Sequence, residues 1–350
     1  MKTKLLAALL SVLFVSLLFE LGLRLLSRNP YAKEDVDHVV QIRRQHAGMD
    51  RSIDRRQIDP ALSEVLMRTD ERGYLLPSRR HAAPDVTIAF FGGSTTECAA
   101  VEEALRFPAL VGDLLAAEGI AANTLNAGKS GNTSHDALNL LLNHVVLDRP
   151  DVAVLMEAIN DIGVLGQAGG YRPRMGGTVV LGDVVRWGLQ ALSIHSHVAA
   201  RLREIVTQGS TVQGGRWYRR REVEEEVQAR VQSFRASLRA FVGAARGLGI
   251  TPVLMTQPLS PRTTELTPSW SNPEWQDHFN EVVRQVAAED GVVLVDLVRE
   301  IPLSRQDWRD PMKVFYDGVH VSDEGSRLYA RVITDRLLET VLAKDRPPAH

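Results

Sequence analysis

From residue 85 to the end of the chain, short apolar runs alternate with longer stretches in which apolar residues recur every three or four positions. The short runs are typical of buried strands and the longer stretches of amphipathic helices. The predicted strands are Val86 to Phe91, Asn123 to Asn126, Val152 to Met156, Thr251 to Thr256 and Val292 to Val295. The predicted helices are Ala104 to Glu118, Thr133 to Leu147, Glu222 to Leu248, Pro273 to Asp290 and Ser322 to Leu342. This alternation predicts an α/β fold, a parallel five-stranded sheet with helices on both faces.

One connection is too long to be a simple loop. Residues 163–221 contain two glycine-rich stretches, at 167–177 and 208–215, with an apolar segment from Val184 to Ile205 between them. Loops of this length in compact domains usually carry function or lack fixed structure. We expect this insertion to form a cap over a ligand site, while packing against a membrane or a partner is the alternative.

The first 26 residues form a strongly apolar segment. An uncharged run from Leu5 to Phe19 continues past Glu20 to Leu26, and this length would just cross a bilayer. Because Glu20 and Arg24 stand four residues apart, they can pair near the far boundary of a membrane. A cleaved signal peptide would need a small-residue cleavage site, and none is evident. We therefore predict that residues 1–26 are an uncleaved signal anchor that forms one transmembrane helix.

The segment after this anchor is polar. Residues 27–84 carry mixed charges with little sustained periodicity, which favours a juxtamembrane stalk or a wrapping segment. Residues 85–343 then form the globular domain. A signal anchor would place that domain outside the cytoplasm, in the periplasm if the cell is Gram-negative.

Composition narrows the class of protein further. The hydrophobic content of 44% over 350 residues is ample for a core. A net charge of -2 offers no electrostatic case for nucleic acid as a partner. The single cysteine, Cys98, excludes an internal disulfide, and we expect it to be a small buried apolar residue.

Polar motifs follow the predicted strands at the points where a ligand site forms in open α/β sheets. Ser94 comes after the first strand, Gly131 after the second and Asn160 after the third, and Asp317 and His320 precede the last helix. Singly, a serine in this place is more often a helix cap, and an Asp and His pair is more often a surface feature. Together they supply a nucleophile, a base and an acid that orients the base, which acyl transfer through a covalent intermediate requires.

These four motifs, at residues 90–96, 126–133, 158–161 and 317–325, resemble those of the SGNH (GDSL-type) hydrolase superfamily in kind and in order. The resemblance implies a three-layer, flavodoxin-like fold, with Ser94 as nucleophile, His320 as base and Asp317 as its orienting acid. It also implies an oxyanion hole made by the backbone N–H groups of Ser94 and Gly131 and the side-chain amide of Asn160. No metal and no cofactor is implied.

Two positions depart from the family pattern. Gly93 stands where the family usually has Asp, and Ala158 stands where it usually has Gly. Neither residue belongs to the Ser, His and Asp chemistry. The departures indicate a divergent branch of the family, and the predicted signal anchor makes this member membrane-anchored.

The expected function is that of a serine esterase, which cleaves an O-acyl ester on a cell-envelope glycan or polysaccharide. An O-acyltransferase with the same triad is an open alternative, and so is a lipid esterase or thioesterase. The expected partners are an ester-bearing small molecule, glycan or lipid and, through the N-terminal helix, the membrane. The sequence predicts no oligomeric state.

Overall fold

The computed structural model describes residues 2–27, 29, 42–56, 58, 63–166, 170–171, 188–189, 191–208, 224–260, 273–301 and 311–343. The chain divides into two compact units. Residues 1–40 and 176–213 form one unit, and residues 41–175 and 214–350 form the other. The predicted motifs all lie in the second unit.

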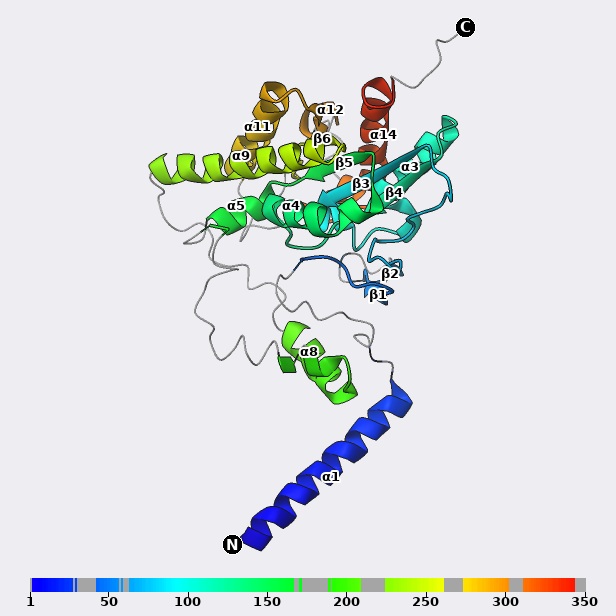
Figure 1. Cartoon of the computed structure of the whole chain (residues 1–350), viewed down its shortest axis with the longest axis vertical. Coiled ribbons are helices and arrows are strands. Elements are labelled where there is room, and N and C mark those ends of the chain that lie inside the picture. The colour runs from blue at the N-terminus through cyan, green and yellow to red at the C-terminus, as the bar shows by residue number, and fades with distance from the viewer. Residues whose placement is uncertain are drawn as a thin grey trace. The chain divides into compact units, whose positions relative to one another are not determined.

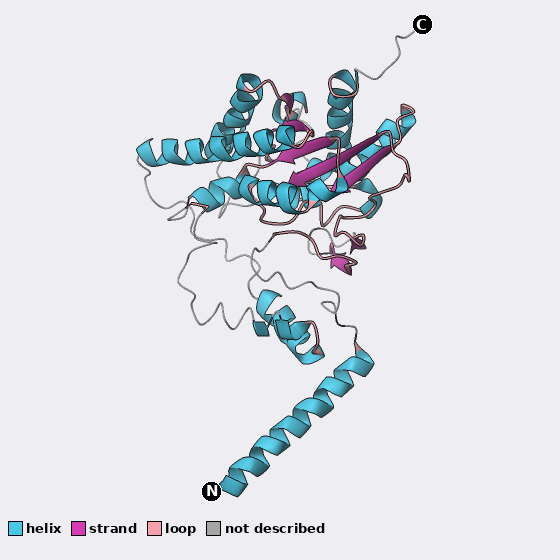
Figure 2. Cartoon of the chain, in the orientation of Figure 1, coloured by secondary structure: helices cyan, strands magenta, loops and turns pink. Residues whose placement is uncertain are grey.

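The centre of the second unit is a parallel sheet of five strands in the order β4-β3-β5-β6-β7. The strands are β3 (Val86–Gly92), β4 (Ala122–Asn126), β5 (Val152–Met156), β6 (Thr251–Met255) and β7 (Val293–Val295). Figures 1 and 2 show the sheet between helices. The predicted five-stranded parallel sheet is therefore confirmed, and each predicted strand matches within a residue or so.

Alternate strand residues bury two separate hydrophobic cores, one on each face of the sheet, because successive side chains of a strand point to opposite faces. Phe91 and Leu155 pack against helices α4 (Ser134–Asn143), α9 (Glu224–Gly247) and α11 (Pro273–Glu289). Phe90 and Val154 pack against α3 (Phe107–Ala117) and α14 (Asp323–Glu339). This two-sided burial explains why the strands read as continuous apolar runs.

Shorter helices connect these elements. They are α2 (Ser94–Glu97), η1 (Glu103–Leu105), η2 (Val145–Asp148), α5 (Ile159–Leu165), α12 (Leu297–Glu300) and α13 (Pro311–Val314). α2 and α5 begin directly after β3 and β5, so they start at the carboxyl edge of the sheet.

An antiparallel hairpin that the sequence did not predict precedes the sheet. Strands β1 (Asp50–Asp54) and β2 (Glu64–Arg68) pair over their full length. The buried Arg106 ties this segment to the core, since its guanidinium donates to the carbonyl oxygens of Leu66 and Leu76 and to that of Cys98. The described part of residues 42–84 is thus built into the unit that contains the sheet.

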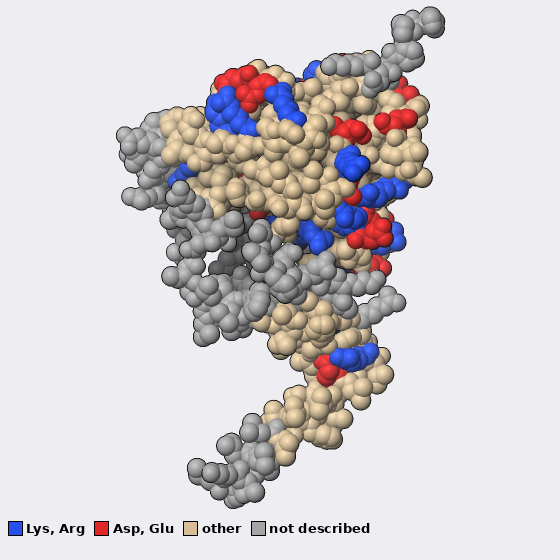
Figure 3. Space-filling model, viewed as in Figure 1, with Lys and Arg blue, Asp and Glu red and all other residues tan. Residues whose placement is uncertain are grey.

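The other unit contains α1 (Lys2–Leu26) and α8 (His197–Gln208). Glu20 pairs with Arg24 at 2.8 Å, as the spacing predicted, and its carboxylate also accepts from Ser196 Oγ and from the backbone N–H groups of His197 and Val198. In Figure 3 the part of α1 that is not grey is mostly tan, with one red and one blue group side by side. Over the described residues, no helix has the length and apolar character needed to cross a membrane. The predicted transmembrane helix is not supported.

The insertion predicted at residues 163–221 lies largely outside the described residues, as do its glycine-rich stretches apart from Gly170, Tyr171 and Gln208. Its apolar segment is described only in part, through residues 188–189 and 191–205. Its predicted role as a cap stays a prediction.

Candidate active site

Ser94 is the first residue of α2 and lies at the turn that leaves β3. The turn is packed so closely that only glycine fits at residue 92. A Cβ there would overlap Thr96 Oγ1 and would come within 2.7 Å of the carbonyl oxygen of Met156. The backbone N–H of Glu97 donates to the carbonyl oxygen of Gly93 at 3.0 Å and closes the first turn of α2. The nucleophile is therefore held on a short, fixed turn at the carboxyl edge of the sheet.

His320 lies between Ser94 and Asp317. Its Nε2 is 2.7 Å from Ser94 Oγ, and its Nδ1 is 2.6 Å from Asp317 Oδ2. The ring also stacks on Tyr316, with centroids 5.5 Å apart and planes 11° apart. The structure thus brings together the three residues in the order that a Ser, His and Asp triad requires.

Asp317 is fixed by its own loop. Its Oδ1 accepts from the backbone N–H groups of Val319 and His320, both at 2.7 Å. Burial alone would raise the pKa of Asp317, but the hydrogen bond and charge of His320 and these two N–H groups outweigh burial, so the pKa is lowered. Asp317 is therefore ionised at neutral pH and holds His320 in the tautomer whose Nε2 can accept the serine proton.

The expected oxyanion donors lie around the same turn. Gly131 has a φ of +77°, a conformation that favours glycine. Asn160 lies in the first turn of α5, and its Nδ2 donates to the carbonyl oxygen of Asn132 at 2.8 Å. One of the two Nδ2 hydrogens is used in that bond, which orients the amide and leaves the second for a ligand. The oxyanion role of these groups stays a prediction.

Gln257 is a buried residue behind the site to which the sequence analysis assigned no role. Its Nε2 donates to Thr95 Oγ1 at 2.7 Å, and its Oε1 accepts from the backbone N–H of Ile159 at 3.0 Å. These two partners are the neighbours of Ser94 and Asn160 along the chain. One side chain therefore joins the nucleophile turn to the turn that carries Asn160.

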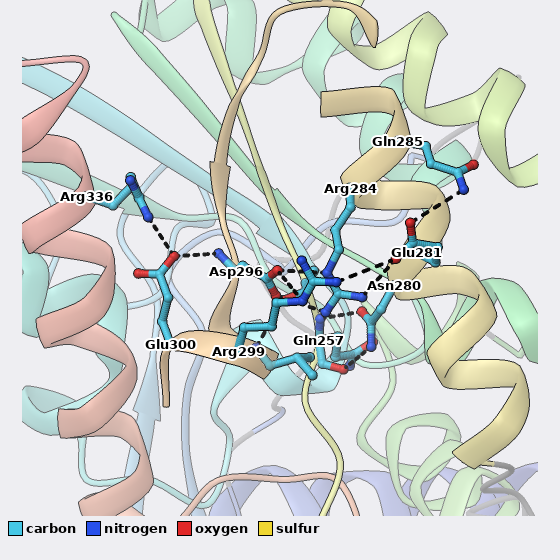
Figure 4. A network of polar contacts seen from close by, with 11 residues as sticks. Gln257, Asn280, Glu281, Arg284, Gln285, Asp296, Arg299, Glu300 and Arg336 are labelled. Atoms are coloured by element: carbon cyan, nitrogen blue, oxygen red, sulfur yellow. Dashed lines mark hydrogen bonds and ion pairs between the residues drawn. The ribbon is translucent and has the colours of Figure 1, made fainter. Parts of the chain in front are cut away.

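A polar network fixes Gln257 in turn (Figure 4). Asn280 of α11 accepts from the backbone N–H of Gln257 and donates to its carbonyl oxygen. Further along α11, Arg284 forms a bidentate pair with Asp296, at 2.7 and 3.0 Å. The guanidinium of Arg336, on α14, donates a hydrogen bond to the Glu300 carboxylate at 2.8 Å. The network links α11, α12 and α14 at the edge of the sheet near the site.

Other residues of functional types in the sequence are not part of this triad. Cys98 is buried, as predicted, and burial raises the pKa of its thiol to about 12, so it is not a second nucleophile. Trp275 is packed in the core. His195 and His197 belong to the unit that contains α1. Trp217 to Arg221 and Trp270 lie outside the described residues.

Comparison with known proteins agrees with the geometry. The sequence profile of the GDSL-like lipase/acylhydrolase family matches residues 90–328, which is more than half of the chain. The chain belongs to this family, as the resemblance predicted, and it is a serine ester hydrolase. No curated protein matches the chain.

Two solved structures are similar to this chain at low identity and with TM-scores below 0.5. A lipase/acylhydrolase from Enterococcus faecalis is 18% identical, with a TM-score of 0.46 over 72% of this chain and 95% of that one. An acetylxylan esterase from Geobacillus stearothermophilus is also 18% identical, with a TM-score of 0.44 over 73% of this chain and 95% of that one. Similarity at this level carries no information about the substrate.

Proposed function

We propose that this protein is a serine esterase that cleaves an O-acyl ester through an acyl-enzyme intermediate, on a cell-envelope glycan or polysaccharide. The observation that carries the proposal is the continuous chain of short contacts from Ser94 Oγ through His320 to Asp317. A serine hydroxyl is a weak nucleophile until a positioned base accepts its proton, and Nε2 lies at hydrogen-bonding distance from it.

The reaction follows from this geometry. Ser94 Oγ attacks the acyl carbon while His320 Nε2 takes its proton, and the negative charge that develops on the carbonyl oxygen is met by the donors at Ser94, Gly131 and Asn160. The imidazolium then gives its proton to the departing alkoxide, which leaves as the alcohol. Water then attacks the acyl carbon while His320 Nε2 takes its proton. His320 gives this proton to Ser94 Oγ as the carboxylic acid is released, which regenerates the free serine.

We also propose that the catalytic unit works outside the cytoplasm and that the N-terminal helix holds it at a membrane. The apolar run of the sequence supports this location. So does the exposure of large apolar side chains along α1, from Leu10 to Leu26, since extended exposed apolar surfaces mark contacts with partners or lipid. This proposed location supports a glycan substrate, because the glycans of the cell envelope lie outside the cytoplasm.

The proposal is tested by incubating the full-length protein in detergent with p-nitrophenyl esters of two to twelve carbons, with and without an oligosaccharide acceptor. An esterase releases nitrophenol and free acid in equal amounts, whether or not the acceptor is present. Acyl transfer to the oligosaccharide, detected by mass spectrometry, would make the protein an O-acyltransferase. A strong preference for the longest esters would favour a lipid esterase. Absence of nitrophenol release from every ester would contradict the proposal.

A further inference from the structure

The loop that carries Gly131 is hydrogen-bonded to residues 43–45, which precede the hairpin. Arg43 donates to Ser130 O at 2.9 Å and to Asn132 Oδ1 at 3.1 Å, and Asn132 Nδ2 donates back to Arg43 O at 3.0 Å. Lys129 Nζ donates to the carbonyl oxygen of Arg44 at 2.7 Å. Residues 43–45 therefore form one wall of the loop at residues 128–132, which we call the Gly131 loop.

Glu97 lies beneath this contact. It is three residues from the nucleophile and 3% exposed. Its Oε2 accepts from both the backbone N–H, at 3.1 Å, and the hydroxyl of Ser130. Its Oε1 accepts from Gln45 Nε2 at 2.5 Å, and the same Nε2 reaches the carbonyl oxygen of Gly128 at 3.2 Å. The Glu97 carboxyl group thus joins α2, which is the nucleophile helix, to the Gly131 loop and to residues 43–45.

The position of Ser130 matters because its carbonyl carbon and the Gly131 nitrogen share one peptide plane. Gly131 has no side chain and a positive φ, so the backbone there is less restricted than at other residues and the plane has alternative orientations. The two bonds to Glu97 fix the N–H and the side chain of Ser130, and so the Cα at which this plane begins. The bond from Arg43 holds the carbonyl oxygen of the plane itself. An N–H that points away from the substrate contributes nothing to the oxyanion.

The close fit between α2 and the loop supports the same reading. A Cβ at Gly128 would lie 2.5 Å from the backbone nitrogen of Glu97 and 2.7 Å from the carbonyl carbon of Thr96. Asn126 Nδ2 donates to Thr96 O at 3.0 Å. The Gly131 loop and the nucleophile helix are therefore in direct backbone contact, and a change at Glu97 acts on both.

We propose that Glu97 is a positioning residue that sets the Gly131 N–H in the oxyanion hole, and that Gln45 completes its hydrogen bonding. This inference rests on the proposed esterase function. It assigns residues 43–45 a part in transition-state stabilisation, through Glu97 and the Gly131 loop.

The test is a donor and acceptor exchange. Glu97→Gln places an amide that can accept from Ser130 or from Gln45 with its single oxygen, so one bond is lost. We expect kcat for p-nitrophenyl acetate to fall by about 10- to 100-fold, less than on deletion of a whole oxyanion donor, with KM changed less than threefold. The double variant Gln45→Glu/Glu97→Gln exchanges the two groups and should recover much of the lost kcat.

Tyr74→Phe is the matched control. It removes one hydrogen bond of the chain between the hairpin and the sheet, from Tyr74 Oη to Asp148 at 2.5 Å, without touching the Gly131 loop, and it should leave kcat unchanged. Thermal unfolding checks that each variant is folded. Unchanged kcat in folded Glu97→Gln, or no recovery in the double variant, would overturn the inference. Failure of the proposed function itself would appear as no turnover by the wild-type protein.

Discussion

Gly93 shows how one small residue shapes the site. A Cβ at this position would overlap Asn160 Nδ2 and would lie 3.3 Å from the carbonyl oxygen of Asn132. Asn160 therefore occupies the space that a side chain at residue 93 would need. This explains in physical terms why the departure from the usual Asp, which the sequence shows without a reason, is compatible with the site.

Gly93→Ala should displace the Asn160 amide and lower kcat for p-nitrophenyl acetate by about 100- to 1,000-fold, the usual effect of losing one oxyanion donor. Asn160→Ala should have a similar effect. Because both changes remove the same donor, the double variant should be little worse than either single variant. Steady-state kinetics on the three variants would contradict this account if the two effects multiplied.

Glu157 is a buried acid in an apolar setting. Both of its carboxyl oxygens are without a hydrogen-bond partner among the described residues. Burial raises its pKa well above the ordinary value, and the nearby Asp161 and Asp136 raise it further. Burial also raises the pKa of Asp161 to about 6, although Ser134 and Tyr171 donate hydrogen bonds to it.

A raised pKa in the folded state determines the direction in which stability changes with pH. The folded protein holds more protons than the unfolded chain, so the free energy of unfolding falls as the pH rises from the unfolded pKa, about 4, through the folded pKa. Glu157→Leu should therefore raise the free energy of unfolding, relative to wild type, by more at pH 8 than at pH 5. Urea unfolding at both pH values measures this difference. The exposed Glu324→Gln is the control, and an equal shift at both pH values in Glu157→Leu would contradict the account.

At the scale of elements, the turns after β3 and β5 depend on a side chain from the turn after β6. Gln257→Leu would leave the Ile159 N–H and the Thr95 hydroxyl without their partner, and a buried donor left unsatisfied costs about 1–3 kcal/mol of stability. We expect lower stability and also a lower kcat, because Ser94 and Asn160 lose their common support. Asn143→Ala, which removes an exposed bond within α4, should change neither by a comparable amount. Reduced stability with unchanged kcat would show that Gln257 supports the fold alone.

The sequence predicted the strands and long helices well because their signal is local. Apolar runs and helical periodicity located β5 with its observed bounds and α11 within one residue. The hairpin of β1 and β2 was missed because four of the five β1 residues are exposed, and the apolar run of β2, Val65 to Met67, is only three residues long. The roles of Glu97 and Gln257 were missed for another reason. The partners that give them these roles, Gln45, Ser130, Thr95 and Ile159, lie 33 to 162 residues away in the chain, and no local pattern reports such contacts.

At the scale of the whole molecule, the site belongs to one unit and the N-terminal helix to the other. The proposed location predicts that a periplasmic reporter fused after residue 343 is active, and that a cytoplasmic reporter at the same point is not. The mature protein should also retain Leu5 to Leu26. N-terminal sequencing that finds a start between residues 20 and 35 would instead indicate cleavage and export.

The central claim is that Ser94 forms the acyl-enzyme. Its most direct test is mass spectrometry of the full-length protein after reaction with a fluorophosphonate, alongside ester turnover. We expect one adduct on Ser94 in wild type, and neither adduct nor turnover in Ser94→Ala, with thermal unfolding showing that the variant is folded. An adduct on another residue, or turnover retained in Ser94→Ala, would contradict the account.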